Sequence, residues 1–174
     1  PVRDGAPVEV ADVEGVRKAP GLEGFKKPIP AGYISMSYGV EVPIEFEAKY
    51  LLGPEGAHLN ITGISGLATK TSYAMFLLNA VQQRLCSGCP EEIHERGVSM
   101  VLLNVKGSDL LSIDEEPQKP LTQDQMEEWR KCGLEPMPFR NVSYLYPFSQ
   151  RRAATSYSNT NLRRGLLAKQ HAEN

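Results

Sequence analysis

The sequence has little of several features that define common protein classes. It contains only three cysteines, its formal net charge is −2 in 174 residues, and no apolar run is long enough to cross a bilayer. A small, odd number of cysteines does not support a disulfide framework. A charge near zero argues against a generally basic nucleic-acid-binding surface. We therefore expect a globular protein without a membrane span, located in the cytoplasm.

The stretch from His58 to Leu78 changes character twice along its length. Residues 58–62 form a short, partly β-branched apolar run, and residues 63–69 are small, hydroxylated and glycine-containing. From Lys70 onward, apolar residues recur at helical spacing. This order of strand, loop and helix is typical of a phosphate-binding unit.

The loop and the start of the helix supply the chemistry that phosphate groups need. Backbone N–H groups in a glycine-containing loop can surround phosphate oxygens, and a helix N-terminus adds partial positive charge. Lys70 would reach the β- and γ-phosphates of ATP, and the Thr71 hydroxyl would ligate Mg²⁺. The nucleotide-binding residues predicted in this way are Gly63, Ser65, Gly66, Ala68, Thr69, Lys70, Thr71 and Ser72.

The loop departs from the usual G-x-x-x-x-G-K-S/T pattern at two positions. Thr69 precedes the lysine where glycine is usual, and Ile64 stands at the position of the first glycine. The alternative interpretation is an ordinary strand-to-helix turn, in which the small residues only allow close packing.

The first 52 residues predict a small β module. Residues 7–13 and 39–46 alternate as strands do, whereas residues 18–32 contain three prolines and three glycines and predict a loop. Turn residues at 51–56 follow. We therefore place a boundary between a barrel-like segment, 1–52, and an α/β domain, 53–174.

Two further strands and a helix are predicted after the phosphate-binding unit. Residues 98–105 form a largely apolar run, which fits a strand buried on both faces of a parallel sheet, and residues 142–146 predict another short strand. Between them, Thr122 and Gln125 predict a capping box, and Gly133 predicts the end of that helix. The resulting order is βαβαβ, which gives a parallel sheet with right-handed crossovers.

Polar residues follow the predicted strand at 98–105. Lys106 and Asp109 come directly after it. Because ligands of open α/β sheets collect at the carboxyl ends of the strands, these side chains would share an edge with the phosphate loop.

Cys86 and Cys89 form a C-x-x-C pair. Half of a zinc site and a redox pair are the functional alternatives. The sequence has no second close pair of ligands, and the cysteines follow the helix rather than precede it. A packing role at the end of the helix is therefore the favoured interpretation.

Three runs together resemble a known family: residues 52–63 (LGPEGAHLNITG), residues 68–71 (ATKT) and residues 103–110 (LNVKGSDL). They are similar to HerA-like proteins of the HerA/FtsK superfamily of P-loop ATPases. Asn104 departs from that pattern, since an acidic residue is common at its position. The resemblance implies a small β-barrel before a RecA-like core, with ATP and Mg²⁺ as cofactors. It also implies a homo-oligomeric ring that moves DNA.

An acidic pair for ATP hydrolysis is missing from the predicted strand ends. The strands after the phosphate loop end at Asn104 and Tyr146, and neither offers the carboxylates that organise magnesium and activate water. The catalytic residues are therefore unknown. We expect the N-terminal, ATP-binding portion of a larger DNA-translocating ATPase, which hydrolyses little by itself.

Two other function classes stay open. The chain could be a non-catalytic assembly or adaptor module with a degenerate phosphate loop, or, with less support, a small P-loop phosphotransferase. Four arginines in the segment 150–165 make DNA a further candidate partner, although a solvated polar segment is the simpler interpretation.

Overall fold

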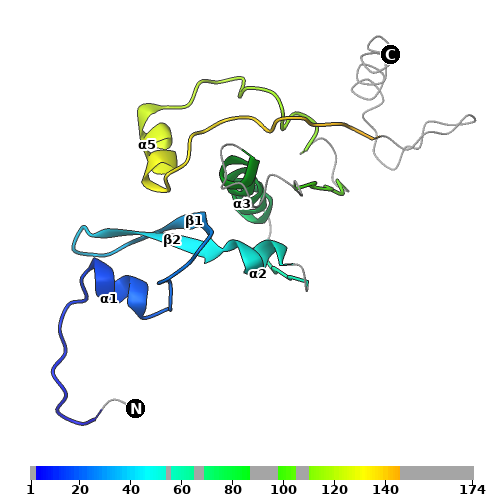
Figure 1. Cartoon of the computed structure of the whole chain (residues 1–174). Helices are drawn as coiled ribbons and strands as arrows, with labels where there is room; N and C mark the ends of the chain where they lie inside the picture. Colours follow the sequence, from blue (N-terminus) through cyan, green and yellow to red (C-terminus); the bar gives the residue numbers. More distant parts are fainter. Residues whose placement is uncertain (1–2, 54–55, 65–68, 87–97, 105–109, 146–174) are drawn as a thin grey trace, which may run out of the picture. The chain divides into compact units, whose positions relative to one another are not determined.

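The computed structural model describes residues 3–53, 56–64, 69–86, 98–104 and 110–145 (Figure 1). The chain divides into two compact units, one formed by residues 1–98 and 117–137 and the other by residues 99–116 and 138–174. All described helices and strands belong to the first unit. The fold is therefore mixed α/β, as expected at the level of class.

An antiparallel hairpin is the only sheet in the described residues. Strand β1, Pro28–Ser35, pairs with β2, Glu41–Glu47, and the register places Ile34 opposite Val42. Val42 is completely buried, as is Ile29 near the start of β1. The strand predicted at 39–46 is thus confirmed. The loop predicted over 18–32 is wrong at its end, because β1 begins at Pro28; both strands of a two-stranded sheet are edge strands, where proline is tolerated.

Two short helices flank the hairpin. Helix α1, Val13–Lys18, begins after Asp12, whose carboxylate accepts a hydrogen bond of 2.8 Å from the Gly15 N–H. The strand predicted at 7–13 is wrong, because no strand is assigned there and Val8 is 94% exposed. Alternation alone forms no strand when no neighbouring backbone completes the hydrogen bonds, and a capping aspartate favours a helix start. Helix α2, Ala48–Leu52, follows β2 directly.

Helix α3, Thr69–Cys86, packs against β1 and confirms the helix predicted from Lys70. Its buried apolar side chains are Leu77, Ala80, Val81 and Leu85, which recur at three- and four-residue intervals. This face joins the core formed by the hairpin, so the position of α3 is fixed relative to β1.

Helix α5, Gln123–Lys131, is closed at both ends by local hydrogen bonds. Thr122 and Gln125 form the predicted capping box. At the other end, the Gly133 N–H donates to Arg130 O and the Leu134 N–H donates to Trp129 O, which is a Schellman motif with glycine at φ +69°. The predicted helix and both of its ends are confirmed.

The strands predicted at 58–62, 98–105 and 142–146 are not assigned in their described parts. The described residues therefore contain neither a parallel βαβαβ core nor a closed barrel. An apolar run predicts burial, but it becomes a strand only where a neighbouring strand pairs with it. Here Val101 and Leu103 are 84% and 85% exposed, so the described run is also not buried.

In the second unit, the described residues form a small hydrogen-bonded cluster. The Phe139 N–H donates to Ile113 O at 2.9 Å, and the Tyr144 hydroxyl donates to Asp114 Oδ1 at 2.5 Å. Burial and the neighbouring Asp114 carboxylate raise the pKa of Tyr144 to about 12. The two segments of this unit are thereby held to each other.

Candidate functional site

The first turn of α3 has the composition of an anion-binding helix start. It contains Thr69, Lys70, Thr71 and Ser72, with three hydroxyl groups and no acidic side chain. The three hydroxyl-bearing residues are exposed. The N–H groups of a first helical turn lack helical partners, and the helix dipole favours negative charge there. The N-terminal end of α3 can therefore accept a phosphate group.

Lys70 folds back over the residues that precede the helix. Its Nζ donates to Gly63 O and to Ile64 O, each at 3.1 Å. The backbone of Gly63 lies close beneath the lysine stem, since a Cβ atom added to Gly63 would be 3.4 Å from Lys70 Cγ. An ammonium has three N–H donors, so one remains for a ligand oxygen. The lysine charge is thereby held at the start of the loop.

The structure brings some of the predicted nucleotide-binding residues together. Gly63 lies against Lys70, with Thr69, Thr71 and Ser72 in the same helical turn. Other predicted residues fall outside the described residues: Ser65, Gly66, Ala68, Lys106 and Asp109. No group of three metal-ligating side chains occurs within the described ranges. Thr71 would thus be a single protein ligand for Mg²⁺, which usually keeps several waters and binds the phosphates of its nucleotide.

Four aromatic side chains from three elements form a pocket that the sequence did not predict. Tyr33 comes from β1, Tyr73 and Phe76 from α3, and Trp129 from α5, and together with Glu128 and Cys132 they line a volume of about 450 Å³. We call it the aromatic pocket. The spacing of Tyr73 and Phe76 places them on one helix face, but no local pattern relates them to Tyr33 or Trp129.

The rings of the aromatic pocket are fixed by mutual contacts. The Phe76 and Trp129 rings are tilted by 55° with centroids 5.3 Å apart, and Tyr73 stacks on Phe76 at 6.1 Å. The Tyr73 hydroxyl donates to Ala31 O at 2.9 Å. Burial raises the pKa of this hydroxyl above its usual value. The tyrosine therefore remains protonated and keeps α3 attached to β1.

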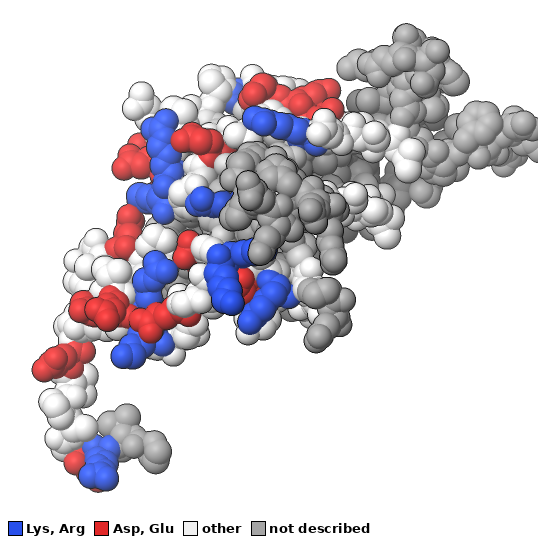
Figure 2. Space-filling model, viewed as in Figure 1, with Lys and Arg blue, Asp and Glu red and all other residues white. Residues whose placement is uncertain are grey.

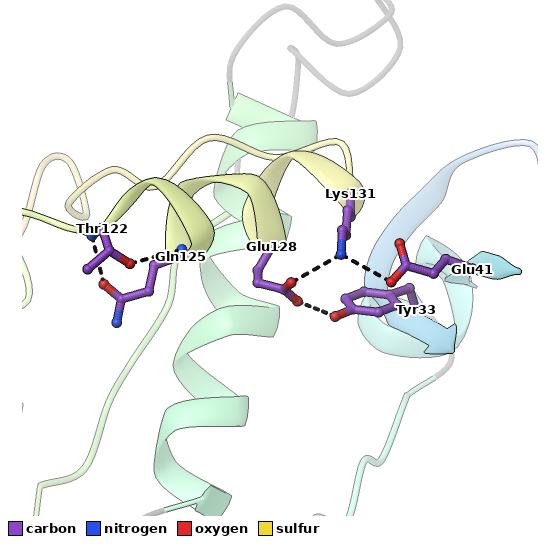
Figure 3. Close-up of polar contacts among 6 residues, drawn as sticks. All are labelled: Tyr33, Glu41, Thr122, Gln125, Glu128 and Lys131. Atoms are coloured by element: carbon purple, nitrogen blue, oxygen red, sulfur yellow. Dashed lines mark hydrogen bonds and ion pairs between the residues drawn. The ribbon is translucent and has the colours of Figure 1, made fainter. Parts of the chain in front are cut away.

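A charged network adjoins the aromatic pocket through Tyr33 and Glu128, which line it. Figure 3 shows the residues of this network. Lys131 Nζ is 3.1 Å from Glu41 Oε1 and 3.2 Å from Glu128 Oε1, and the Tyr33 hydroxyl donates to the other Glu128 oxygen. The hydrogen bond from Tyr33 lowers the pKa of Glu128 the most, and the hydrogen bond from Lys131 lowers it further. Hydrogen bonds to Glu41 and Glu128 raise the pKa of Lys131. The network connects α5 to both strands of the hairpin.

Side chains of α3 also hold the segment that follows α5. Gln83 forms a pair of hydrogen bonds with the Glu135 backbone, with Nε2 donating to the carbonyl at 2.7 Å and Oε1 accepting from the N–H at 3.1 Å. Asn79 Nδ2 donates to Met137 O at 2.8 Å, and an Arg84 nitrogen donates to Gly133 O at 3.0 Å. Residues 133–137 are thus fixed along α3 without a partner strand.

The described residues include only some of the cysteines, so they test the prediction for Cys86 and Cys89 only in part. Cys132 is a free, buried thiol, and burial raises its pKa. Cys89 lies outside the described residues, and Cys86 is the last residue of α3. The packing interpretation of the C-x-x-C pair therefore stays a prediction.

The charges on the face shown in Figure 2 are mixed. Lysine and arginine side chains are interspersed with aspartate and glutamate among the coloured residues. This face gives no argument for DNA contact by the described residues, and the arginine-containing segment 150–165 lies outside them.

Among the helices of the described ranges, none combines the length and the apolarity of a membrane span. The chain has no significant match among protein-family models, curated proteins or solved structures.

Proposed function

We propose that this chain is the ATP-binding portion of a HerA-like DNA-translocating ATPase and that the phosphates bind at the start of α3. The observation that carries the proposal is the position of Lys70. Its ammonium is fixed against Gly63 O and Ile64 O, beside a helical turn that has hydroxyl groups and no carboxylate. A cation and a helix N-terminus in this arrangement together favour a polyphosphate.

Each side chain has a separate task in this proposal. Lys70 gives up part of its hydrogen bonding to the two carbonyls and donates to the β- and γ-phosphate oxygens instead. The Thr71 hydroxyl ligates the Mg²⁺ that bridges the phosphates. No carboxylate pair is assigned to water activation, so the chain binds ATP and hydrolyses little. The RecA-like core, the preceding β-barrel, the homo-oligomeric ring and the DNA partner are those that the family resemblance implies for the intact protein.

Calorimetric titration with Mg-ATP tests the role of Lys70. Lys70→Ala removes a charged hydrogen bond to the phosphates, which should cost on the order of 2–3 kcal/mol, or roughly a 30- to 150-fold weaker Kd. Lys49→Ala is the matched control, because Lys49 is an exposed lysine on α2 that contacts Tyr50. Lys106→Ala should cost about 1 kcal/mol or less through screened attraction.

The order of these effects is the decisive result. If all three variants lose equal affinity, or Lys106→Ala loses the most, the phosphates bind elsewhere and the start of α3 is an ordinary strand-to-helix turn. Circular dichroism of each variant shows that the comparison is made between folded proteins. If the unsubstituted chain gives no heat and no thermal shift with saturating Mg-ATP, the proposal is wrong.

A non-catalytic assembly module is the second candidate. The observation that favours it is the exposed apolar run in the second unit, where Val101 and Leu103 are largely accessible to solvent. Large exposed apolar groups are typical of interaction surfaces. In this case, Val101→Ser with Leu103→Ser would abolish self-association in sedimentation experiments, and ATP would have no effect on it.

A further inference from the structure

We propose that the aromatic pocket binds a small methylated ammonium ion such as choline. The inference does not depend on the ATP proposal, because the pocket is formed by β1, α3 and α5 and includes none of the predicted nucleotide-binding residues. Its volume of about 450 Å³ is within the range of small-ligand sites, roughly 300–1,000 Å³.

The walls of the pocket suit a cation that carries methyl groups. Aromatic faces attract cations through the ring quadrupole, and several rings around one site form the usual cage for quaternary ammonium groups. Phe76 and Trp129 contact each other at a tilt of 55°, so they form two adjoining parts of the pocket wall at an angle to each other. Tyr33 already has a cation over its ring, because Lys131 Nζ lies 5.3 Å from the ring centroid. The pocket is thus lined by several aromatic rings, and one of them already lies beside a cation at the rim.

The charge at the rim is complementary to such a ligand. Glu41 and Glu128 supply two negative charges and Lys131 supplies one positive charge, which leaves a net charge of −1 in the network. Glu128 lines the pocket itself. A single positive charge on a ligand therefore balances the site without displacing Lys131.

The hydrogen bonds in the pocket favour a methylated ammonium over a nucleobase. The Tyr73 hydroxyl donates to Ala31 O, and the Tyr33 hydroxyl donates to Glu128. A nucleobase brings several donors and acceptors that lose water on binding and cost energy if they stay unpaired. A trimethylammonium group has no hydrogen-bond donor or acceptor, so it needs no hydrogen-bonding partner from the pocket, where both tyrosine hydroxyls are already bonded.

Trp129 gives a direct test, because it is the single tryptophan of the chain and it lines the pocket. Choline chloride is titrated into the full chain at constant ionic strength while tryptophan fluorescence is recorded. The comparison ligand is the uncharged isostere of choline, in which a tert-butyl group replaces the trimethylammonium group. We expect a saturable change with choline and at least fivefold weaker binding of the isostere, in line with cation–π and charge contributions.

Two variants separate the charge from the rings. Glu128→Gln should weaken choline binding severalfold and leave the isostere unchanged, whereas Glu127→Gln, an exposed position beside it on α5, should change neither. Phe76→Leu keeps an apolar side chain and removes one aromatic face, so it should weaken choline more than the isostere. Because the ratio between choline and its isostere in the unsubstituted chain is itself diagnostic, the test does not depend on these variants folding.

Three outcomes would overturn the proposal. Equal binding of choline and the isostere would mean that the pocket is only apolar. A fluorescence response to adenosine but not to choline would assign the pocket to a nucleobase. Binding of a trimethyllysine peptide without binding of choline would assign it to a protein partner rather than to a small molecule.

Discussion

Asn79 provides a quantitative test of how α3 holds residues 133–137. The side chain is 4% exposed, its Nδ2 donates to Met137 O at 2.8 Å, and its Oδ1 accepts from Gln83 Nε2 at 2.6 Å. Asn79→Asp keeps the size and the acceptor but removes the donor. It also places a carboxylate oxygen beside a carbonyl oxygen, so both the lost hydrogen bond and the buried charge destabilise the fold.

The expected loss follows from these two changes. A carbonyl that loses its partner and a poorly solvated carboxylate cost about 1–3 kcal/mol together when the site is partly buried. Burial raises the pKa of the new carboxyl group above that of an unfolded aspartate. Its destabilising effect is therefore largest at neutral pH and shrinks as the pH falls through the raised pKa, where the protonated acid can again donate to Met137 O.

Urea unfolding followed by tryptophan fluorescence measures the effect. The free energy of unfolding of Asn79→Asp is compared with that of the unsubstituted chain and of Asn79→Ala, at neutral pH and near pH 4. Asn79→Ala has no titrating group, so its deficit relative to the unsubstituted chain should not depend on pH. A deficit for Asn79→Asp below about 0.5 kcal/mol at neutral pH, or one that does not shrink in acid, would refute the role assigned to Asn79.

Three further predictions concern α5. Thr122→Ala removes one half of the capping box with Gln125, so the free energy of unfolding in urea should fall by about 1 kcal/mol. Loss of the whole fold would contradict a role of Thr122 limited to capping α5. Gly133→Ala should cost roughly 1–2 kcal/mol, because φ is +69° and a Cβ would lie 2.9 Å from an Arg84 nitrogen; a neutral result would contradict the left-handed backbone. Because the pKa of Glu128 is lowered in the fold, its contribution to stability is full above the usual pKa of glutamate and is lost as the pH falls through the lowered value. The difference in unfolding midpoint between the chain and Glu128→Gln should therefore vanish in acid, and a constant difference would count against the network.

The parts of the fold that sequence could predict are those set by local chemistry. The ends of α5 follow from Thr122, Gln125 and Gly133, whose side chains or backbone satisfy groups within a few residues. The start of α3 at Thr69 likewise follows from the change of pattern at Lys70. Such elements need no knowledge of what packs on them.

The parts that could not be predicted depend on distant residues. β1 contains Pro28 and Pro30, which are usual loop signals, and only its pairing with β2 makes this segment a strand. The aromatic pocket joins Tyr33 to Trp129 across 96 positions of sequence, since 129 minus 33 is 96, and no periodic pattern spans that distance. Conversely, the apolar runs at 58–62 and 98–105 predicted strands. A strand needs a neighbouring strand to pair with, and the described residues contain none for these two segments.

The prolines of the hairpin have a consequence for aggregation. An incoming strand adds to a sheet edge through backbone N–H and C=O groups, and proline has no N–H to offer. Pro28 and Pro30 stand on β1 and Pro43 stands on β2, so both edges of this sheet are interrupted. The hairpin is thereby a poor template for edge-to-edge growth. Replacing these prolines with β-branched residues would make the same hairpin more prone to form extended intermolecular sheets.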